Sequence, residues 1–539
     1  MHAFVKHHKS LILLGLLAFT LRIITINWDN AIALHPDERM IMFVVERLSL
    51  HNLNPDFFSY GSLPIYLLAI AKTLVSVVDM SAAQYPNILY VGRFLSTLFD
   101  TGSTILIAMI GHKLFNRNIG LIAGFLYATA VFPIQNAHFF ITDPQLSFWM
   151  LLTFWILVRK DSLSTKTFLL AGITAGLSAA TKFSGIVTLG FPFLWLALNI
   201  KNLPTSKLRF LLTNGFVTTL GGVFAFFITQ PYALINYAEY SSQVGSQIAM
   251  NSDASVFPYT IQFLHSIAYI DPLYGIIWWG LGIPLGIVSM VGVFFVIWKN
   301  RRTTTAQLTL FYLFYGIYFL VFGRSAVKFM RYYLPLYPLL ILSAAVLIYS
   351  LNSLLHTHLP RWSKTSMVLL FGYLMMWPIM YLTALSGPNT RVVASDWIFK
   401  NLPAKSTIIY EAWDDALPFS NNGTYILEQI DVYPTESDAK LQALNSQLDK
   451  GDYLVLSSKR VYRSILLNED LYPKTAAWYR DLFNGRTNYQ LIKTFTSYPR
   501  ITFGSFSYIV PDNIAPENFT IFDHPKVMIF KNIDKDENW

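Results

Sequence analysis

Long apolar runs separated by short polar loops fill the first 385 residues of the chain. A run of roughly 17–25 apolar residues is long enough to cross a bilayer as a helix, and about eleven runs approach that length. The predicted spans are residues 10–27, 93–114, 119–137, 144–158, 167–181, 185–200, 210–229, 274–298, 306–322, 332–350 and 366–385. We interpret the first run as an uncleaved span rather than a secretory signal, because so many spans follow it.

One further apolar stretch, residues 62–79, is interpreted as a re-entrant or interfacial helix. If it crossed the membrane, His112, Lys113 and Arg117 would lie on the outer side, and every later loop would change sides. Residues 28–92 are therefore predicted to form the first outer loop, which carries interfacial helices.

The distribution of charge supports this layout. Only 13% of the 539 residues are charged and 54% are hydrophobic, whereas about a quarter of the residues in soluble proteins are charged. Lysine and arginine collect in the loops predicted to be cytoplasmic, and the outer loop 231–272 has neither. The net charge of +9 thus reflects membrane topology and gives no reason to expect nucleic acid as a partner. We predict a multi-pass protein of the plasma (inner) membrane with a cytoplasmic N-terminus.

The composition changes near residue 386. Residues 386–539 are predicted to form an extracytoplasmic α/β domain that follows a transmembrane domain of residues 1–385. Strands are predicted at Thr407–Tyr410, Tyr453–Ser457, Ser505–Val510 and Val527–Phe530. Amphipathic helices are predicted at Thr390–Lys400, Ser437–Leu448 and Thr475–Phe483. The sequence Trp413-Asp414-Asp415 is interpreted as an acidic turn that caps a loop rather than as a contact for an acceptor sugar.

Two adjacent acids, Asp37 and Glu38, follow His35 and Pro36 in the first outer loop. Proline at the first helical position with acids behind it is an ordinary helix start. The run Met40–Val45 is apolar, so this helix is predicted to lie at the membrane surface. A carboxylate is costly near hydrocarbon, and one placed here can take a proton from an attacking hydroxyl. Asp37 and Glu38 are therefore catalytic candidates, and His35 is a candidate for the wall of a cavity.

A third acid, Asp143, precedes Pro144 between two predicted spans, on the same side of the membrane as Asp37. It can cap the following helix, or it can share a site with the acids of the first loop. Such a site can orient an acceptor or bind a divalent cation. The candidate metal ligands are Asp37, Glu38, Asp143 and His265. A lone histidine in a long outer loop is more often structural, so metal dependence stays open.

Cationic residues on the outer side form the second candidate group. The candidates for binding a phosphate are Lys182, Arg324, Lys328 and Arg331. Lys328 and Arg331 are spaced to share one helical face, and an arginine fork suits a phosphate. Snorkelling toward lipid headgroups would explain the same positions. Lys182 lies between two short apolar runs and needs a carboxylate or a phosphate as a partner. Tyr332 and Tyr333 are further candidates for the cavity wall.

Five short motifs occur in an order and spacing that are typical of one group of membrane enzymes. They are Asp37-Glu38, Arg93-Phe94-Leu95-Ser96, Thr142-Asp143-Pro144, the segment from Gly176-Leu177 through Thr181-Lys182-Phe183-Ser184-Gly185, and Arg331-Tyr332-Tyr333-Leu334-Pro335-Leu336-Tyr337-Pro338. With these motifs, residues 10–350 resemble the GT-C glycosyltransferases of the protein O-mannosyltransferase and aminoarabinose-transferase type (glycosyltransferase family 39-like). The part beyond Ser386 resembles the extracytoplasmic appendage of many bacterial members.

The resemblance implies an inverting transfer of a hexosyl or pentosyl group from a polyprenyl-phosphate donor to an acceptor on the outer face of the membrane. It implies that Asp37 is the general base, with Glu38 beside it, and that Asp143 is the second acid of the site. The cations implied to neutralise the leaving phosphate are Lys182, Lys328 and Arg331. This chain departs from the pattern before Pro64, where relatives often carry a polar or charged residue and this sequence has Gly61-Ser62-Leu63.

The chemistry is consistent with the residues themselves. Breaking the bond between the anomeric carbon and phosphate builds negative charge, which cations stabilise, and inversion requires no covalent carboxylate. The absence of cysteine from the sequence excludes thiol catalysis and disulfides.

Two other classes of function remain as alternatives. A secondary transporter would use acids and cations to line a path near the bilayer midplane, and an envelope scaffold would use the C-terminal domain to bind a partner. Both fit the acids at one membrane boundary less well. The sequence does not distinguish a protein, a lipid or a glycan as the acceptor.

Overall fold

The computed structural model describes residues 2–160, 164–203, 206–302 and 304–538. The remaining residues (1, 161–163, 204–205, 303 and 539) fall within the predicted ranges 1–385 and 386–539 but lie outside this description.

The first part of the chain is helical. Its elements are α1 (His2–Ile23), α2 (Pro36–Arg47), α3 (Ser62–Val78), α4 (Ile88–Leu114), α5 (Arg117–Thr129), α6 (Val131–Ala137), α7 (Thr142–Val158), α8 (Thr165–Thr181), η1 (Phe183–Leu189), α9 (Gly190–Leu198), η2 (Ile200–Asn202), α10 (Lys207–Thr229), α11 (Tyr232–Ile235), α12 (Tyr237–Ser252), η3 (Pro258–Phe263), α13 (Ile270–Tyr274), η4 (Gly275–Gly280), α14 (Ile283–Asn300), α15 (Ala306–Phe322), η5 (Met330–Leu336), α16 (Tyr337–His358) and α17 (Pro360–Leu385).

Each predicted span coincides with helical structure, but fewer helices meet the requirements for crossing a bilayer. Within the described residues, five helical segments are long and apolar enough, and six if the pair α5 and α6, bent by 57°, counts as one. The five are Ile88–Leu114, Lys207–Thr229, Ile283–Asn300, Met330–His358 and Pro360–Asn401. The character of a helical membrane protein is thus confirmed, and the count of about eleven spans remains a prediction.

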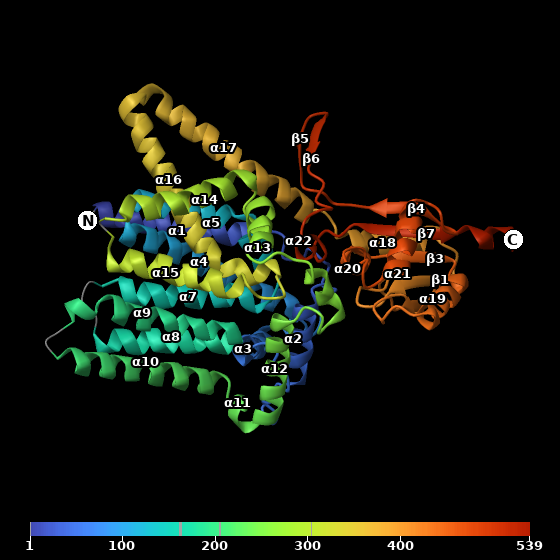
Figure 1. Cartoon of the computed structure of the whole chain (residues 1–539), viewed down its shortest axis with the longest axis horizontal. Coiled ribbons are helices and arrows are strands. Elements are labelled where there is room, and N and C mark those ends of the chain that lie inside the picture. The colour runs from blue at the N-terminus through green and yellow to red at the C-terminus, as the bar shows by residue number, and fades with distance from the viewer. Residues whose placement is uncertain (1, 161–163, 204–205, 303, 539) are drawn as a thin grey trace.

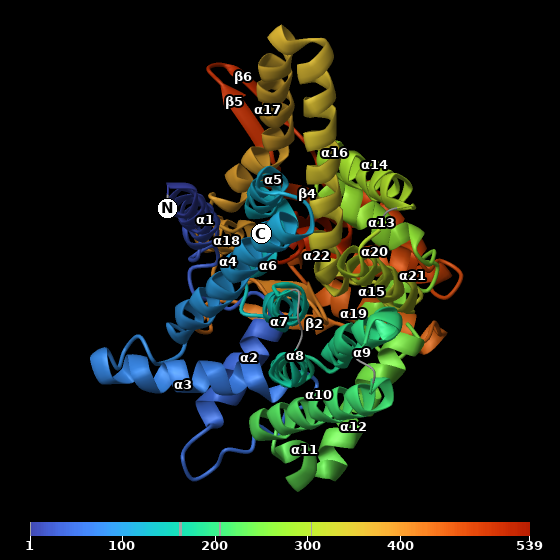
Figure 2. The same ribbon diagram turned by 90° about the vertical axis from the view of Figure 1, so that its left-hand side faces the viewer.

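Helix α3 crosses the direction of the bundle. Helices α7 and α8 run along the long axis of the molecule in Figure 1 and are seen end-on in Figure 2, where α3 lies across them. Helix α3 is apolar, and Leu74, Val77 and Val78 near its end are exposed. An apolar helix in this orientation suits the interface of a bilayer, and the interfacial position of residues 62–79 remains a prediction.

Small residues bring neighbouring spans close together. A Cβ atom on Gly172 of α8 would collide with the carbonyl oxygen of Thr218 in α10, and one on Gly176 would collide with that of Gly222. Close approach of this kind supplies the van der Waals packing that joins helices in a bilayer, where no hydrophobic force acts between them.

The second part of the chain contains the sheets. Its elements are α18 (Thr390–Asn401), β1 (Thr407–Glu411), β2 (Ile426–Ile430), α19 (Asp438–Lys450), β3 (Tyr453–Leu456), α20 (Arg460–Leu466), α21 (Pro473–Phe483), β4 (Tyr489–Phe495), β5 (Arg500–Phe503), β6 (Phe506–Ile509), α22 (Glu517–Thr520), β7 (Val527–Asn532) and η6 (Ile533–Asn538).

Five of these strands form one mixed sheet in the order β2-β1-β3-β7-β4. Strand β1 is parallel to β2 and β3, whereas β7 is antiparallel to β3 and β4. The sequence predicts β1, β3, β6 and β7 but misses β2, β4 and β5. Strand β4 lies at an edge and is largely exposed, so it lacks the buried face on which a pattern-based prediction depends.

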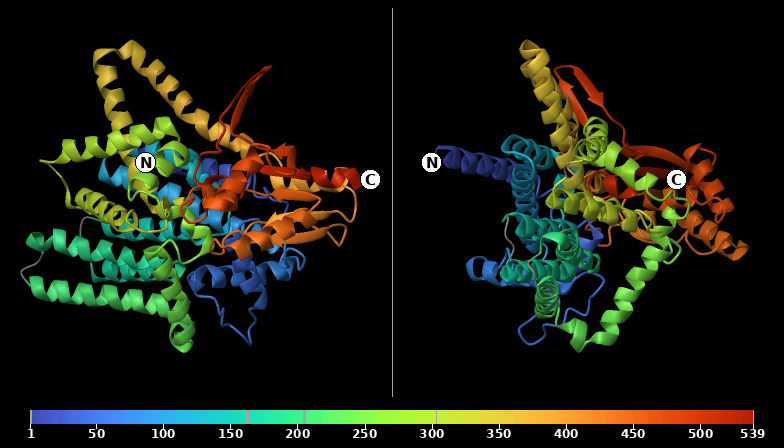
Figure 3. Two further views of the ribbon diagram at one scale, coloured as in Figure 1. Left: turned by 45° about the vertical axis from the view of Figure 1, so that its right-hand side comes forward. Right: turned by 60° about the vertical axis from the view of Figure 1, so that its left-hand side comes forward.

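The sheet domain lies at one end of the helical bundle (Figure 3) and is joined to it by the segment that follows β6. Ala515, Phe519 and Phe522 from this segment belong to the same buried apolar cluster as the helices of the bundle. The two parts of the chain therefore share a core, and a cavity lies where they meet.

Candidate active site

Helix α2 begins at Pro36, as predicted, and His35 is its N-cap. The Nδ1 atom of His35 accepts a hydrogen bond from the backbone N–H of Asp37 at 3.3 Å. The His35 ring is buried between Phe139 and Phe522, with ring centroids 4.8 and 4.0 Å away. Burial lowers the pKa of His35 to about 3, so the ring stays neutral and Nδ1 can accept. His35 caps the helix and does not line the cavity, which corrects the prediction for this residue.

Glu38 is held in a buried ion pair rather than in the cavity. Its two carboxylate oxygens accept hydrogen bonds from Arg93 of α4 at 2.8 and 2.7 Å, and one also accepts from the backbone N–H of Phe140 at 3.0 Å. The same guanidinium binds Asp29 at 2.8 Å. A carboxylate with this many partners stabilises the fold and is not available for catalysis, so the structure does not bring Glu38 to the predicted site.

Asp37, one position earlier, faces the cavity. Its carboxylate pairs with the guanidinium of Arg331 and is hydrogen-bonded by the Tyr60 hydroxyl. Burial favours the neutral acid, but the Arg331 guanidinium outweighs it, with help from the Tyr60 hydroxyl, and holds the pKa of Asp37 below its ordinary value. Asp37 is therefore an ionised carboxylate at the surface of a cavity.

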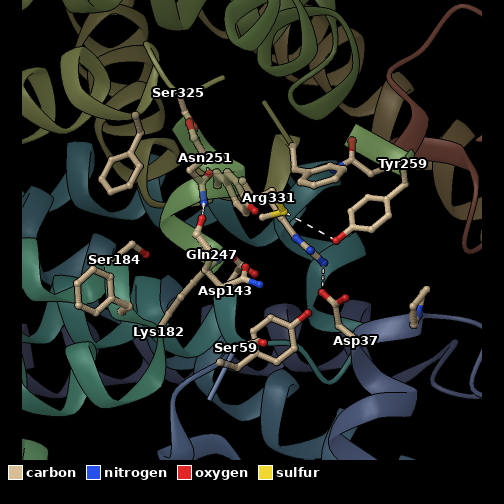
Figure 4. A pocket seen from close by; sticks show the side chains of 18 of the residues that line it. Asp37, Ser59, Asp143, Lys182, Ser184, Gln247, Asn251, Tyr259, Ser325 and Arg331 are labelled. Atoms are coloured by element: carbon tan, nitrogen blue, oxygen red, sulfur yellow. Dashed lines mark hydrogen bonds and ion pairs between the residues drawn. The ribbon is translucent and has the colours of Figure 1, made fainter. Parts of the chain in front are cut away.

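Asp143 and Lys182 form a second ion pair in the same cavity. The Nζ atom of Lys182 donates to Asp143 at 2.8 Å and lies 4.4 Å from the centre of the Tyr332 ring. Asp143 lies in the first turn of α7, and Lys182 follows the last residue of α8. The structure thus brings together Asp37, Asp143, Lys182 and Arg331, all of which line the cavity (Figure 4).

Arg331 has a hydrogen-bonding group to spare. One terminal nitrogen binds Asp37, and the guanidinium lies 5.4 Å from the Phe329 ring. Its Nε atom is buried and has no hydrogen-bond partner among the described residues. A buried donor without a partner is costly.

The cavity has a volume of about 720 Å³ and two kinds of wall. The charged residues lie on one side, and apolar side chains form another. The apolar lining includes Phe183, Ile186, Val187, Ile248, Val321 and Phe322. Several of these side chains are exposed, among them Ile186, Ile248 and Val321. The charged pairs therefore share the cavity with an accessible apolar wall.

Three other predicted residues lie elsewhere. Lys328 donates to the Ser266 hydroxyl at 2.8 Å, Arg324 is exposed, and neither lines the cavity. Phe329 has extended backbone and η5 begins only at Met330, so the spacing of three residues does not place Lys328 beside Arg331. Tyr333 is buried and donates to the Phe322 carbonyl at 3.2 Å, whereas Tyr332 does line the cavity.

The predicted metal ligands do not form a metal site. His265 is exposed and lies 3.3 Å from Asp470, and Glu38 is occupied by Arg93. Among the described residues, no cluster of three or more histidine, aspartate or glutamate side chains can hold an ion. Asp37 and Asp143 each have a cation as a partner, so the charge of the site suits an anion better than a divalent cation.

The sheet domain supplies a wall of the cavity that the sequence did not predict. The lining residues from this domain are Trp413, Asp414, Asp415, Arg460, Glu517, Asn518 and Phe522. Asp415 pairs with Arg39 of α2 at 3.0 Å, and Arg460 pairs with Glu517 at 2.7 Å. The turn interpreted from the sequence as a loop cap is thus part of the site.

Trp413 has an unusual backbone conformation. Its φ of 71° lies in the left-handed region, which is rare for a bulky residue, and its side chain is 47% exposed. Its ring lies 5.9 Å from that of Tyr259, another lining residue. Strain of this kind is often retained at functional sites. In the sequence, the tryptophan next to two acids is the feature that could have pointed to a cavity wall in this domain.

A family comparison covers part of the helical region. Residues 87–234 match the family model of dolichyl-phosphate-mannose-protein mannosyltransferases. This range includes three of the motifs noted in the sequence, those around Arg93, Asp143 and Lys182. No curated protein sequence matches the chain significantly.

Solved structures match over much more of the chain. The archaeal oligosaccharyltransferase AglB from Archaeoglobus fulgidus, in complex with an inhibitory peptide and a dolichol-phosphate, has a TM-score of 0.55 at 12% identity, covering 94% of this chain and 74% of that one. The structure of the same enzyme in complex with Zn and sulfate has a TM-score of 0.53 at 13% identity, covering 94% of this chain and 74% of that one. ArnT from Cupriavidus metallidurans, bound to undecaprenyl phosphate, gives 0.48 at 12% identity, covering 85% of this chain and 94% of that one.

The match to the oligosaccharyltransferase is a match of fold. It covers both the helical bundle and the sheet domain, and it confirms the GT-C fold expected from the sequence motifs.

Proposed function

We propose that the chain is an inverting glycosyltransferase that moves a sugar from a polyprenyl-phosphate donor to an acceptor hydroxyl. The observation that carries the proposal is the pair of ion pairs, Asp37 with Arg331 and Asp143 with Lys182, in one cavity that has an apolar wall. The dolichol-phosphate in the oligosaccharyltransferase structure supports a donor of this class, as does the description of the matching family.

The two cations are proposed to bind the donor phosphate. Without a ligand, each cation has a carboxylate as a partner, so the site is close to neutral. A phosphate that binds Lys182 and Arg331 would loosen the pairing of Arg331 with Asp37. The pKa of Asp37 would then rise toward the pH of the reaction, which makes the carboxylate a better proton acceptor.

The chemical step requires one base and one stabilised leaving group. The acceptor oxygen attacks the anomeric carbon on the face opposite the phosphate, and its proton moves to the Asp37 carboxylate. The bond between the anomeric carbon and the phosphate oxygen breaks, and the polyprenyl phosphate leaves with the electron pair. Lys182 and Arg331 stabilise the charge that develops on it. A single displacement inverts the anomeric configuration.

The apolar wall is proposed to admit the lipid part of the donor from the bilayer. Ile186, Ile248 and Val321 line the cavity and are exposed. A polyprenyl chain that lies against them would stay in an apolar environment while its phosphate reaches the cations.

The sheet domain is proposed to bind the acceptor. Trp413 offers an exposed indole, and Asp415 and Arg460 offer polar groups on the wall that faces the helical bundle. An aromatic face beside carboxylates and a guanidinium can position a hydroxyl of a protein, a lipid or a glycan.

The chain is proposed to work as two units, a transmembrane part of residues 1–385 and an extracytoplasmic part of residues 386–539. The proposed membrane is the plasma (inner) membrane, with the N-terminus in the cytoplasm and the cavity on the outer face. This orientation follows from the lysine and arginine residues, which collect in the loops on the same side as the N-terminus.

The proposal is tested with the purified protein in liposomes that contain a labelled polyprenyl-phosphate sugar and an envelope extract as acceptor. We expect covalent transfer with the wild type and its loss in Asp37→Asn. Glu46→Gln is the control, because Glu46 is an acid of the same helix that pairs only with Lys72 at the surface. Undiminished transfer by Asp37→Asn would remove this residue from the mechanism, and uptake of substrate without covalent transfer would favour a transporter.

A further inference from the structure

Strands β5 and β6 form a hairpin that is separate from the main sheet of the domain. The hairpin projects away from the domain beside α17 (Figures 1 and 2). Two-stranded hairpins have little stability alone in water and need a surface to pack against. The described residues provide such a surface only near the base, because the residues toward the tip are exposed.

The two faces of the hairpin differ in polarity. Ile501 pairs with Tyr508 and Phe503 pairs with Phe506, and paired residues and alternate residues lie on the same face. This face is thus entirely aromatic and aliphatic. The opposite face consists of Arg500, Ile509, Thr502 and Ser507.

The apolar face is open to its surroundings. Phe503, Phe506 and Tyr508 are 67%, 63% and 51% exposed. Two neighbouring phenylalanines at the tip of an isolated hairpin are a contiguous exposed apolar patch, and patches of this kind mark surfaces that bind a partner or a membrane.

The base of the hairpin is attached to the end of a helix that is long and apolar enough to cross the membrane. The Thr383 hydroxyl of α17 donates to the carbonyl of Arg500 at 2.7 Å, and the Ser497 hydroxyl donates to the carbonyl of Ala384 at 3.0 Å. Helix α17 ends at Leu385. The hairpin therefore leaves the protein at the level where this span emerges from the bilayer.

Helix α17, which holds the base of the hairpin, also has exposed apolar side chains. Tyr373, Met376 and Ile379 of this helix are exposed, as is usual for side chains that contact lipid. Aromatic residues concentrate at the boundary between hydrocarbon and water, where their rings are favourable. A membrane is thus the partner that lies nearest to the exposed face.

We propose that the hairpin β5–β6 is a membrane anchor whose aromatic face lies in the lipid interface on the side of the sheet domain. Ile501, Phe503, Phe506 and Tyr508 contact lipid, and Thr502 and Ser507 face water. The anchor holds the segment that follows β6, which carries the cavity residues Glu517 and Phe522.

The experiment uses the absence of cysteine from the sequence, which allows a label to be placed at a single position. The full-length variants Phe506→Cys and Ser507→Cys are labelled with an environment-sensitive fluorophore and reconstituted in lipid nanodiscs. These residues are adjacent in β6 but lie on opposite faces. Quenching is measured with lipids brominated near the headgroup and with aqueous iodide.

We expect the label at 506 to emit at a shorter wavelength and to be quenched severalfold more by brominated lipid than the label at 507. Iodide is expected to quench the label at 507 more. Equal quenching of both positions by iodide would overturn the proposal. A label at 506 that is shielded from iodide but not quenched by brominated lipid would also overturn it, because a second copy or another protein would then cover the face.

A second pair keeps the test independent of one substitution. Phe503→Cys and Thr502→Cys lie on the other strand, again on opposite faces. Agreement between the two pairs is required, and normal gel-filtration behaviour of each variant excludes misfolding as the cause of a difference.

Discussion

Asp37 and Glu38 are neighbours in α2 but point in different directions. Successive residues of an α-helix are rotated by about 100°, so one carboxylate reaches the cavity and the other reaches Arg93. Which acid has which role depends on the position of α4, and the sequence around residues 37 and 38 does not contain that information.

The two acids should therefore respond differently to removal of the charge. Asp37→Asn is expected to lower the rate of transfer by about 10²–10⁴-fold, the contribution of a general base, and to cost less thermal stability than Glu38→Gln, because the Asp37–Arg331 pair is partly open to the cavity whereas the Glu38–Arg93 pair is fully buried. Glu38→Gln is expected to lower the temperature of unfolding, because it weakens a buried ion pair. Transfer assays and thermal unfolding in detergent measure both effects, and equal loss of stability in the two variants would contradict the assignment.

Arg331 should set the pH dependence of transfer. It is the main favourable cause of the low pKa of Asp37, so Arg331→Gln is expected to raise that pKa. Because the base must be deprotonated, the acid limb of kcat/KM should move to higher pH. Arg47→Gln, at the last turn of α2, is the matched control. An acid limb that does not move would show that Asp37 is not the group that titrates.

At the scale of the element, Arg93 fixes the shape of the segment between α1 and α2. It binds Glu38 at the start of α2 and Asp29 in the preceding turn, where Ala31 and Ala33 have φ values of 60° and 61°. The carboxylate of Asp29 also accepts hydrogen bonds from the backbone of this turn. The ion pairs of Arg93 with Asp29 and Glu38 therefore hold this strained turn and the start of α2, so that Asp37 faces the cavity.

Removal of the Arg93 guanidinium should lower the stability of the fold. Arg93→Met would leave two buried carboxylates without a cation, and the expected loss is about 3–5 kcal/mol in the free energy of unfolding. Lys72→Gln, which removes a surface ion pair with Glu46, is expected to cost about 1 kcal/mol or less. Denaturant unfolding in mixed micelles measures the difference, and similar values for both variants would contradict a structural role for Arg93.

The elements show where pattern-based prediction succeeds. The predicted ranges 167–181 and 306–322 agree with helices α8 and α15 within two residues, because a long apolar run in a membrane protein has one stable conformation. The assignment of Lys328 to the site failed because it assumed a continuous helix through Phe329, which is extended. A single residue of extended backbone changes which neighbours share a face.

At the scale of the molecule, the sheet domain is joined to the bundle by a buried histidine between two acids. His524 lies 2.7 Å from both Asp512 and Asp523, and Asp523 accepts hydrogen bonds from Gln135 of α6 and Tyr381 of α17. Burial opposes the charge of the imidazole, but Asp523 and Asp512 outweigh it and raise the pKa of His524 to about 10.

The contacts of His524 with Asp512 and Asp523 should make the stability of the protein depend on pH. The pKa of His524 is higher in the folded protein than the ordinary value of 6.5, so its contribution is complete below pH 6.5 and is lost as the pH rises toward 10. The difference in unfolding temperature between the wild type and His524→Gln is expected to shrink over this range. His265→Gln, an exposed histidine, is the control. A difference that is constant from pH 6 to pH 10 would contradict the raised pKa.

The composition of the cavity could be predicted only in part. Four of the five charged lining residues of the helical part, Asp37, Asp143, Lys182 and Arg331, come from motifs that can be recognised in the sequence, and the fifth is Arg39. The opposite wall depends on contacts such as that of Arg39 with Asp415, which are 376 positions apart. No local pattern encodes such a contact, because it depends on how the domain docks on the bundle.

The separation of the two walls in the sequence also has a consequence in time. Ribosomes synthesise Asp37, Asp143 and Lys182 long before Glu517 and Phe522, and the helices that carry the early residues can insert while the rest of the chain is still being made. Until translation passes residue 522, the acids and cations of the helical wall are present but the wall from the sheet domain is incomplete. If the sheet domain binds the acceptor as proposed, newly inserted protein is inactive until this domain has folded against the bundle.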